Sequence, residues 1–318
     1  MEPAWELQSD PDVLTNGNEG RFHLSAPKPI PIRDRASGHV IQEFMDDSKP
    51  TYESKPRRSI AQWISSSPTI DWLFAAYQNT RLSARKIEPF IRKHRIDMTE
   101  FEPGPYQTYA EFFERKFRPG KRTFPKERGT MGAFAEARYF AWEKLDLEMQ
   151  FPIKGHSLRP ELLLEDRELA QRFDGGPVFL ARLAPVDYHH LHYVDAGMTK
   201  RVNRLGRRLW TVNPNALRHQ ADIPFRNERS IQVLETENFG CVTLVEIGAL
   251  SVGRIVQEHD TDKPFKRGDR KAVFRFGGSA VVMFGEKGRW IPVDDLLHTT
   301  REGMETFVRL GEPIARKL

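Results

Sequence analysis

Two glycines precede a serine in the run FGGSA, residues 276–280. Glycine tolerates backbone angles that other residues avoid, so a serine after such a pair can turn its hydroxyl onto the preceding carbonyl. Attack of Ser279 on the Gly278 carbonyl would convert that amide into an ester. Elimination would then break the chain, and hydrolysis of the dehydroalanine would leave a pyruvoyl group at position 279 and release ammonia. A glycine-rich strand bulge is the alternative interpretation of these residues.

A second run, LAPVDYHHLHYVDAG, concentrates side chains that transfer protons. His189 and His192 stand three residues apart, beside Asp187 and Tyr188, and imidazole can gain or lose a proton near neutral pH. The same residues would suit zinc or iron, but such a site needs a third and a fourth ligand, and no second obvious cluster supplies them. We therefore predict no metal. Alternation along an extended segment predicts that His190 points the other way.

The elements that hold these residues are predicted to be strands. Beyond Arg138 the chain consists of short apolar runs separated by turn signals, which is typical of a β-rich domain. We expect an antiparallel catalytic core over 129–318, with the FGGSA loop between two neighbouring strands. The predicted strands include PVFLARL, YHHLHYV, RLWTV, SIQVLET, CVTLVEIGALSVGRIV, AVFRF and SAVVMF.

Residues 57–128 are predicted to form helices. The run RLSARKIEPFIRKHRIDM places Leu82, Ile87, Phe90 and Ile91 on one face, with cations opposite. Further on, the run TYAEFFERKF has the spacing of a capping box, and a Pro-Gly pair is predicted to stop its helix. The fold class is therefore α+β, with N-terminal amphipathic helices packed on the β-rich core.

The first 56 residues are rich in Pro, Asp, Ser and Lys, which predicts an extended arm without a core of its own. After it, Trp63 and Trp72 lie in an apolar stretch that follows two arginines. Such a stretch suits an anionic membrane surface, because tryptophan favours the boundary between apolar and wet surroundings. A helix hairpin packed on the protein's own core is the alternative.

The whole chain has a formal net charge of +5 and 39% hydrophobic residues. A basic protein favours an acidic partner, either nucleic acid or anionic lipid. Because the zinc-ligand cysteines and aromatic-basic signatures of nucleic-acid-binding domains are absent from the sequence, we predict no nucleic-acid partner. The acidic N-terminus and the lack of a long apolar run predict an intracellular protein that does not cross a bilayer.

Taken together, these runs resemble the phosphatidylserine decarboxylase proenzymes, from about residue 59 to the C-terminus. The resemblance implies self-cleavage between Gly278 and Ser279 into a β chain, 1–278, and an α chain, 279–318. It implies that Ser279 becomes a covalent pyruvoyl cofactor, which decarboxylates phosphatidylserine to phosphatidylethanolamine and CO2 at a membrane surface. It also implies a homodimer. Further runs that carry the resemblance are YAEFFERKFRPGKRTFP, IKGHSL, TVNPNAL, FRNER, KRGDRKAVFRFGGSAVVMF and METFVRLGEPI.

Several site roles follow from the resemblance. His192 resembles the histidine that helps to deprotonate the serine during maturation, and His189 resembles the one that binds substrate and transfers a proton. We place Tyr188 with His189 as substrate-binding. Glu136, followed by alanine, stands where family members carry Asp-Gly, so we expect it to be the catalytic carboxylate.

Three departures keep other functions open. Glu136 has a longer side chain than aspartate, and a base misplaced by about an ångström can lose ~100-fold in rate. Ala280 replaces the usual Thr or Ser, and the run Arg270-Lys271-Ala272 replaces an acidic-apolar-Gly run. The alternatives are a pyruvoyl decarboxylase of a free amino acid, since fungal tryptophan decarboxylases carry a glutamate near this position, and an uncleaved lipid-binding pseudoenzyme.

Overall fold

The computed structural model describes residues 31–42, 73, 75–145, 160–205, 228–248, 254–275 and 279–318. Four of the sequence predictions fall outside these ranges. They concern the tryptophan stretch with Trp63 and Trp72, most of the arm 1–56, the strand RLWTV, and the position of Gly278.

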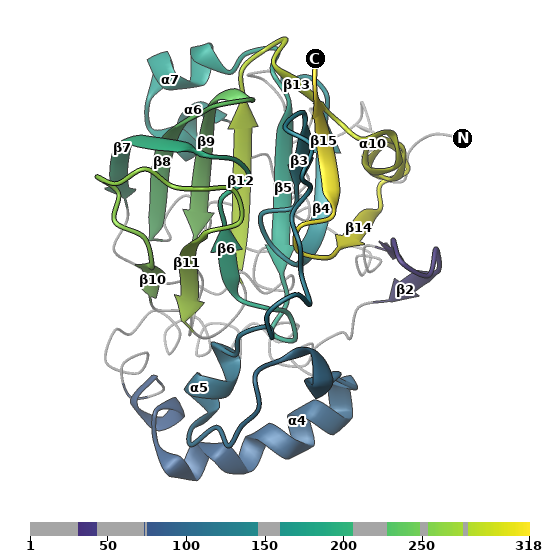
Figure 1. The fold of residues 1–318 in the computed structure, drawn as a ribbon, viewed down its shortest axis with the longest axis vertical. Helices are drawn as coiled ribbons and strands as arrows, with labels where there is room; N and C mark the ends of the chain where they lie inside the picture. The colour runs from purple at the N-terminus through teal and green to yellow at the C-terminus, as the bar shows by residue number, and fades with distance from the viewer. Residues whose placement is uncertain are drawn as a thin grey trace, which may run out of the picture.

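A nine-stranded sheet forms the centre of the molecule (Figure 1). Its order is β2-β1-β14-β4-β5-β12-β9-β8-β7, and every neighbouring pair is antiparallel except β1 with β14. The sheet is therefore mixed rather than purely antiparallel. Its strands are β1 (Pro31–Asp34), β2 (Val40–Gln42), β4 (Ala137–Trp142), β5 (Val178–Leu183), β7 (Gly197–Leu205), β8 (Arg229–Thr236), β9 (Gly240–Ile247), β12 (Ser279–Gly285) and β14 (Glu305–Val308).

Two three-stranded sheets share a core with one face of this large sheet. One consists of β10 (Arg254–Gln257), β11 (Arg270–Arg275) and β6 (His190–His192), and the other of β13 (Trp290–Pro292), β15 (Pro313–Lys317) and β3 (Thr130–Gly132). Figure 1 shows β6, β10 and β11 in front of β8, β9 and β12. The buried side chains between these layers form the main core, which includes Leu191, Phe274, Val281 and Met283.

The opposite face of the large sheet is covered by two short helices, α6 (Pro160–Leu164) and α7 (Arg167–Arg172). Val282 and Phe284 of β12 pack into this second core, with Leu163 and Phe173. Because successive side chains of a strand point to opposite faces, a strand buried on both faces needs a continuous apolar run. The run SAVVMF meets this need and makes β12 a central strand.

Residues 81–113 form short helical pieces that lie beyond one end of the sheets (Figure 1). Ile87, Phe90 and Ile91 pack against Phe112 and its aromatic neighbours, as predicted for one helix face. Leu82 does not, because it lies in a 3-10 segment and is exposed. The pieces are η2 (Arg81–Lys86), α4 (Ile87–His94), η3 (Met98–Glu100) and α5 (Tyr109–Phe113); a last helix, α10 (Asp294–Arg301), contacts β4.

The capping box at α5 is present in part, because the Thr108 hydroxyl accepts the Glu111 N–H at 3.1 Å. The helix ends at Phe113, well before the Pro-Gly pair expected to stop it. The reason is a long-range contact. Phe117 forms a β-bridge with Phe101, and the strand-like hydrogen bonds around that bridge replace helical ones.

An α+β protein with a β-rich core was predicted and is confirmed, but two details of the prediction are wrong. Part of the supposed arm, 31–42, forms β1 and β2, since Ile32 is fully buried and β1 pairs with β14. In addition, the strands that flank residues 276–278 are not neighbours in one sheet. β11 lies in a three-stranded sheet and β12 in the large one.

Candidate active site

Ser279 is the first residue of β12, between β5 and β9 in the large sheet. It lies opposite Leu183 of β5, and by alternation its side chain shares a face with Val281 and Met283, toward the main core. The residue is 1% exposed, and its Oγ has no hydrogen-bond partner among the described residues. An unpaired buried hydroxyl costs free energy, and this one is left available for chemistry.

His189 is connected to Ser279 by the end of β5: Ser279 pairs with Leu183, and His189 contacts the next residue. Its Nε2–H donates to the carbonyl of Ala184, the residue after Leu183, at 3.0 Å. Its ring stacks on Phe113 with centroids 4.0 Å apart. Burial, and secondarily the Arg115 cation, lower the pKa of His189 well below its ordinary value. The imidazole is therefore neutral, and its Nδ1 keeps a lone pair that no described residue occupies.

His192 and Tyr188 form a pair of their own. The Tyr188 hydroxyl donates to Nε2 of His192 at 3.1 Å, and the His192 Nδ1–H donates to the Gly268 carbonyl at 2.8 Å. Burial raises the pKa of Tyr188 and lowers the pKa of His192 to about 4. Tyr188 as a substrate-binding residue stays a prediction; in this structure its hydroxyl donates to His192.

His190 lies on the same side of the chain as His192, contrary to the prediction. Its ring stacks on Tyr188 at 4.6 Å, while its Nδ1 meets the Glu258 carboxylate and its Nε2 the Glu114 carbonyl. The period of two that governs a strand explains this, because residues 190 and 192 of β6 share one face. His189 is the histidine that stands apart.

Glu136 is held by an arginine. Its two carboxylate oxygens accept from Arg122 at 2.6 and 3.0 Å, and one of them also accepts the Leu310 N–H. Arg122 forms a second two-pronged pair with Glu100. Among the described residues, neither histidine nor Ser279 is a partner of Glu136. The structure thus brings Ser279 and His189 to one strand end, and gives Glu136 a different set of bonds.

Three arginines that the sequence analysis did not single out surround the site. Besides Arg122, Arg138 pairs with the buried Asp187, and Arg115 donates to the backbone carbonyls of residues 186 and 187. Each partner is distant in sequence, so no local spacing could have identified these contacts. The only local signal was the carboxylate of Asp187 beside the histidine pair.

The titration of His192 gives a testable pH dependence. The unfolded chain binds a proton at this histidine near pH 6.5, whereas the folded protein does so near pH 4. Unfolding therefore takes up a proton between these values, so stability present above pH 6.5 is lost as the pH falls toward 4, by about 3 kcal/mol.

We expect His192→Gln to reduce the difference between the unfolding free energies at pH 7 and pH 4 by about that amount. Urea unfolding at both pH values measures it in a Ser279→Ala background, which is expected to keep every variant and its parent as one chain. The exposed His298→Gln is a control that leaves the difference unchanged. An equal pH dependence in His192→Gln and parent would contradict the assignment.

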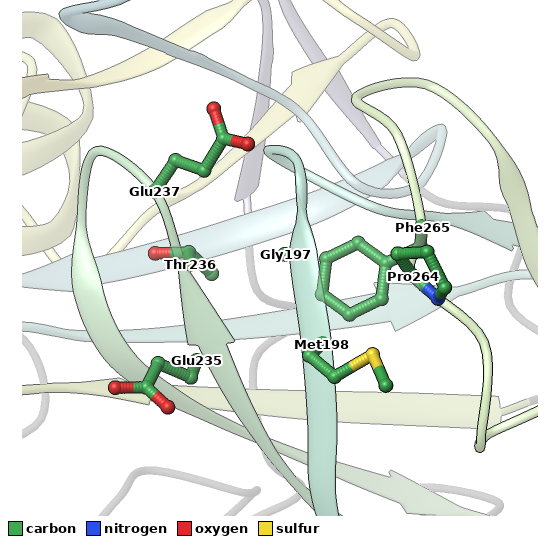
Figure 2. A pocket seen from close by; sticks show the side chains of 7 residues that line it. All are labelled: Gly197, Met198, Glu235, Thr236, Glu237, Pro264 and Phe265. Carbon is green, nitrogen blue, oxygen red and sulfur yellow. The ribbon is translucent and has the colours of Figure 1, made fainter.

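A surface pocket of about 320 Å³ lies elsewhere, between the start of β7, the end of β8 and the loop before β11 (Figure 2). Figure 2 shows Phe265 and Met198 on one side, with Glu235 and Glu237 on the other. The end of β8 is remote from Ser279, since Arg229, at its start, pairs with Ile247 beside Ala280. This pocket is not part of the site.

Comparison with known proteins supplies an independent finding. A model of the family described as phosphatidylserine decarboxylase matches residues 109–316. The chain is similar to the phosphatidylserine decarboxylase proenzyme of Ruminiclostridium cellulolyticum, with 34% identity over 238 residues, 74% of this chain and 79% of that protein. It is 32% identical to that of Clostridium novyi, covering 81% and 92%, and 30% identical to that of Clostridium tetani, covering 93% and 98%.

Proposed function

This chain belongs to the phosphatidylserine decarboxylase family, and we propose that it is a proenzyme that cleaves itself at Ser279 and then converts phosphatidylserine to phosphatidylethanolamine and CO2. The observation that carries the proposal is the buried hydroxyl of Ser279 at the start of a central strand, which has no hydrogen-bond partner within the described ranges. This serine lies inside the region that the family model matches.

Self-cleavage uses the hydroxyl as a nucleophile. Ser279 Oγ adds to the Gly278 carbonyl carbon, and the peptide C–N bond then breaks. Residue 279 now has a free α-amine and is joined to Gly278 by an ester through its Oγ. Loss of the α-proton expels the Gly278 carboxylate and leaves dehydroalanine. Water then replaces the nitrogen, which departs as ammonia, so that a ketone stands at position 279. A neutral imidazole that accepts the hydroxyl proton assists the first step.

The residues present fit a pyruvoyl group derived from Ser279. The Oγ of Ser279 is a buried oxygen that no described residue hydrogen-bonds, and His189 has an Nδ1 lone pair that can hold a proton. Such a group supplies an electron sink for the loss of CO2. His189 takes and returns a proton at Nδ1, and the main core around Ser279 excludes water from the reacting atoms.

For maturation we propose His192, with Tyr188 fixing its ring, and Glu136 as the supporting carboxylate. The Nδ1–H of His192 is donated to a carbonyl, so its Nε2 is the nitrogen that can accept a proton once the Tyr188 hydroxyl turns away. Among the described residues, the carboxylate of Glu136 is bound by Arg122 and by the Leu310 N–H rather than by a histidine. A cleavage step that breaks the pair of Glu136 with Arg122 is expected to be slow.

Substrate assays test the proposal directly. The purified protein should separate on a denaturing gel into a long chain and a short one, and it should release CO2 from phosphatidylserine in mixed micelles. Release from free serine or tryptophan instead would favour the amino-acid decarboxylase. A single uncleaved band with no CO2 from any of these substrates would favour the lipid-binding pseudoenzyme.

We further propose that the protein meets its lipid substrate at an anionic membrane surface, as a peripheral protein. No helix of the described ranges is long and apolar enough to cross a bilayer. Near η2, however, Leu73, Tyr77 and Leu82 are 58%, 40% and 58% exposed. Arginines and a lysine of η2 accompany them. Exposed apolar side chains beside cations suit an anionic headgroup layer.

We expect the triple variant Leu73→Ser/Tyr77→Ser/Leu82→Ser to lose at least about half of its binding to vesicles that contain phosphatidylserine, because less apolar surface can enter the interface. Flotation measures the bound fraction. Val40→Ser removes an equally exposed apolar side chain on β2 and should bind like the parent. Equal flotation of the triple variant and the parent would remove this surface from the proposal. The implied homodimer is a separate prediction, which sedimentation tests.

A further inference from the structure

Asp187 occupies the turn that joins β5 to β6, between the partner strand of Ser279 and the histidines. Its backbone N–H donates to the Ala184 carbonyl at 2.9 Å, and its carboxylate accepts the Ala184 N–H at 2.6 Å. The two bonds hold the Ala184 residue from both sides. Ala184 follows Leu183, which faces Ser279 across the sheet.

The aspartate is itself held rigidly. Its carboxylate forms a buried ion pair with Arg138 of β4. Arg115, buried after α5, donates to the carbonyls of Val186 and Asp187 at 2.6 and 3.1 Å. The turn is thus tied to β4 on one side and to the helical segment on the other.

The Ala184 carbonyl connects this turn to His189. It accepts the Nε2–H of His189 at 3.0 Å, as well as the Asp187 N–H. A carbonyl oxygen can only accept, so Nε2 must carry the proton of the neutral ring, and Nδ1 must carry the lone pair. The nitrogen available for proton transfer is therefore chosen by the position of one carbonyl.

We propose that Asp187 is a positioning residue for decarboxylation: by fixing the Ala184 peptide, its carboxylate holds His189 in the tautomer whose Nδ1 is free. Among its partners in the described part of the chain, Asp187 has neither Ser279 nor the ring of His189. The inference rests on the role proposed above for His189. Orienting partners of a functional histidine commonly change activity 10–100-fold when removed, by the analogy of metal-bound histidines.

The test is Asp187→Asn in the full-length protein. One carboxylate oxygen, Oδ2, accepts both from Arg138 and from the Ala184 N–H, so an uncharged side chain that is no longer anchored by Arg138 holds the Ala184 peptide less firmly. We expect self-cleavage at the parental rate, kcat for phosphatidylserine lower by about 10- to 100-fold, and KM within about twofold. Asp187→Glu, which restores the charge, should recover part of kcat.

Asp195→Asn is the matched control. Asp195 is also buried, pairs with an arginine, Arg267, and accepts a backbone N–H from Asn238. It should lose stability without losing kcat. An Asp187→Asn enzyme with parental kcat, or one that no longer cleaves itself, would overturn the inference. The proposed function would still stand in that case, provided that the parent cleaves itself and is active. An inactive parent would defeat the proposed function itself, and this inference with it.

A measurement on the unmodified protein keeps the test valid if Asp187→Asn does not fold. Nitrogen NMR of protein with labelled histidine, with His189 assigned by its absence in His189→Gln, reports which ring nitrogen carries the proton. We expect a protonated Nε2 and a bare Nδ1 in the parent, and a mixture of tautomers in a folded Asp187→Asn. A parent whose His189 is protonated at Nδ1 would overturn the inference.

Discussion

Replacing Ser279 with alanine is expected to leave one full-length chain with no detectable decarboxylase activity. The methyl side chain cannot attack the Gly278 carbonyl, so neither the new chain ends nor a ketone at position 279 can form. Both losses have one cause and should appear together. In a partly impaired variant, by contrast, activity should rise in step with the fraction of cleaved chain.

The same substitution should not weaken the fold. The Ser279 Oγ is buried without a partner among the described residues, so its removal breaks no hydrogen bond that they provide. Relief of an unsatisfied buried hydroxyl is expected to change the free energy of unfolding by between zero and about +1 kcal/mol. The variant should therefore be at least as stable as the uncleaved parent, which separates loss of chemistry from loss of structure.

On one sample, a denaturing gel shows whether the chain is cleaved, intact mass shows whether a ketone has formed, and CO2 release measures activity. Ser230→Ala is the control, because Ser230 is also buried in the large sheet, on β8. It should cleave and turn over like the parent. Cleavage of Ser279→Ala at the parental site, or activity without cleavage, would refute the role of Ser279.

The strands around the site could be predicted because their signals are local. An unbroken apolar run such as SAVVMF has to be buried on both faces, and this requirement alone identifies β12 as central. The capping bond from Thr108 to the Glu111 N–H spans three residues and depends on little else. The α+β class followed from the same kind of local pattern.

The pairing of charges could not be predicted, because it is decided by residues that meet only in the folded chain. The protein has 49 basic and 44 acidic side chains, and nothing near Glu136 in sequence indicates that Arg122 will take its carboxylate. The same holds for Arg138 and Asp187. A glutamate at position 136 was visible in the sequence, but what its carboxylate can do depends on this long-range partner.

The predicted length of the helix at α5 and the predicted direction of the His190 side chain were both wrong. Helix propensity extended the run past Phe113, but the bridge between Phe101 and Phe117 competes for the same backbone groups. For His190, side chains do alternate along the strand, but the prediction grouped His192 with His189 instead of with His190. The strand begins at residue 190, so 190 and 192 share a face and His189 does not.

Lys271 lies in the run Arg270-Lys271-Ala272, and its replacement should have the largest effect on stability. A bulge in β11, between its pairings with β6 at Arg270 and Ala272, inserts the lysine as an extra residue. Lys271 and Glu246 of β9 are both 0% exposed and form an ion pair. Gln257 closes the ring by accepting from Lys271 and donating to Glu246.

We expect Lys271→Met to lower the free energy of unfolding by about 3–5 kcal/mol, because it leaves Glu246 as a buried charge without a cation. The double variant Lys271→Met/Glu246→Gln should recover most of this loss. Its two neutral amides, at 246 and 257, can donate to each other, and replacing a buried ion pair with uncharged groups is often close to neutral in cost.

Urea unfolding in the Ser279→Ala background measures these differences on an uncleaved chain. Lys263→Met is the control, since Lys263 pairs with Asp260 at the exposed surface, where an ion pair contributes little to stability. If Lys271→Met cost no more than this control, the buried ring would contribute little. If the double variant were as unstable as the single one, the loss would come from altered packing of the β11 bulge rather than from the unpaired charge of Glu246.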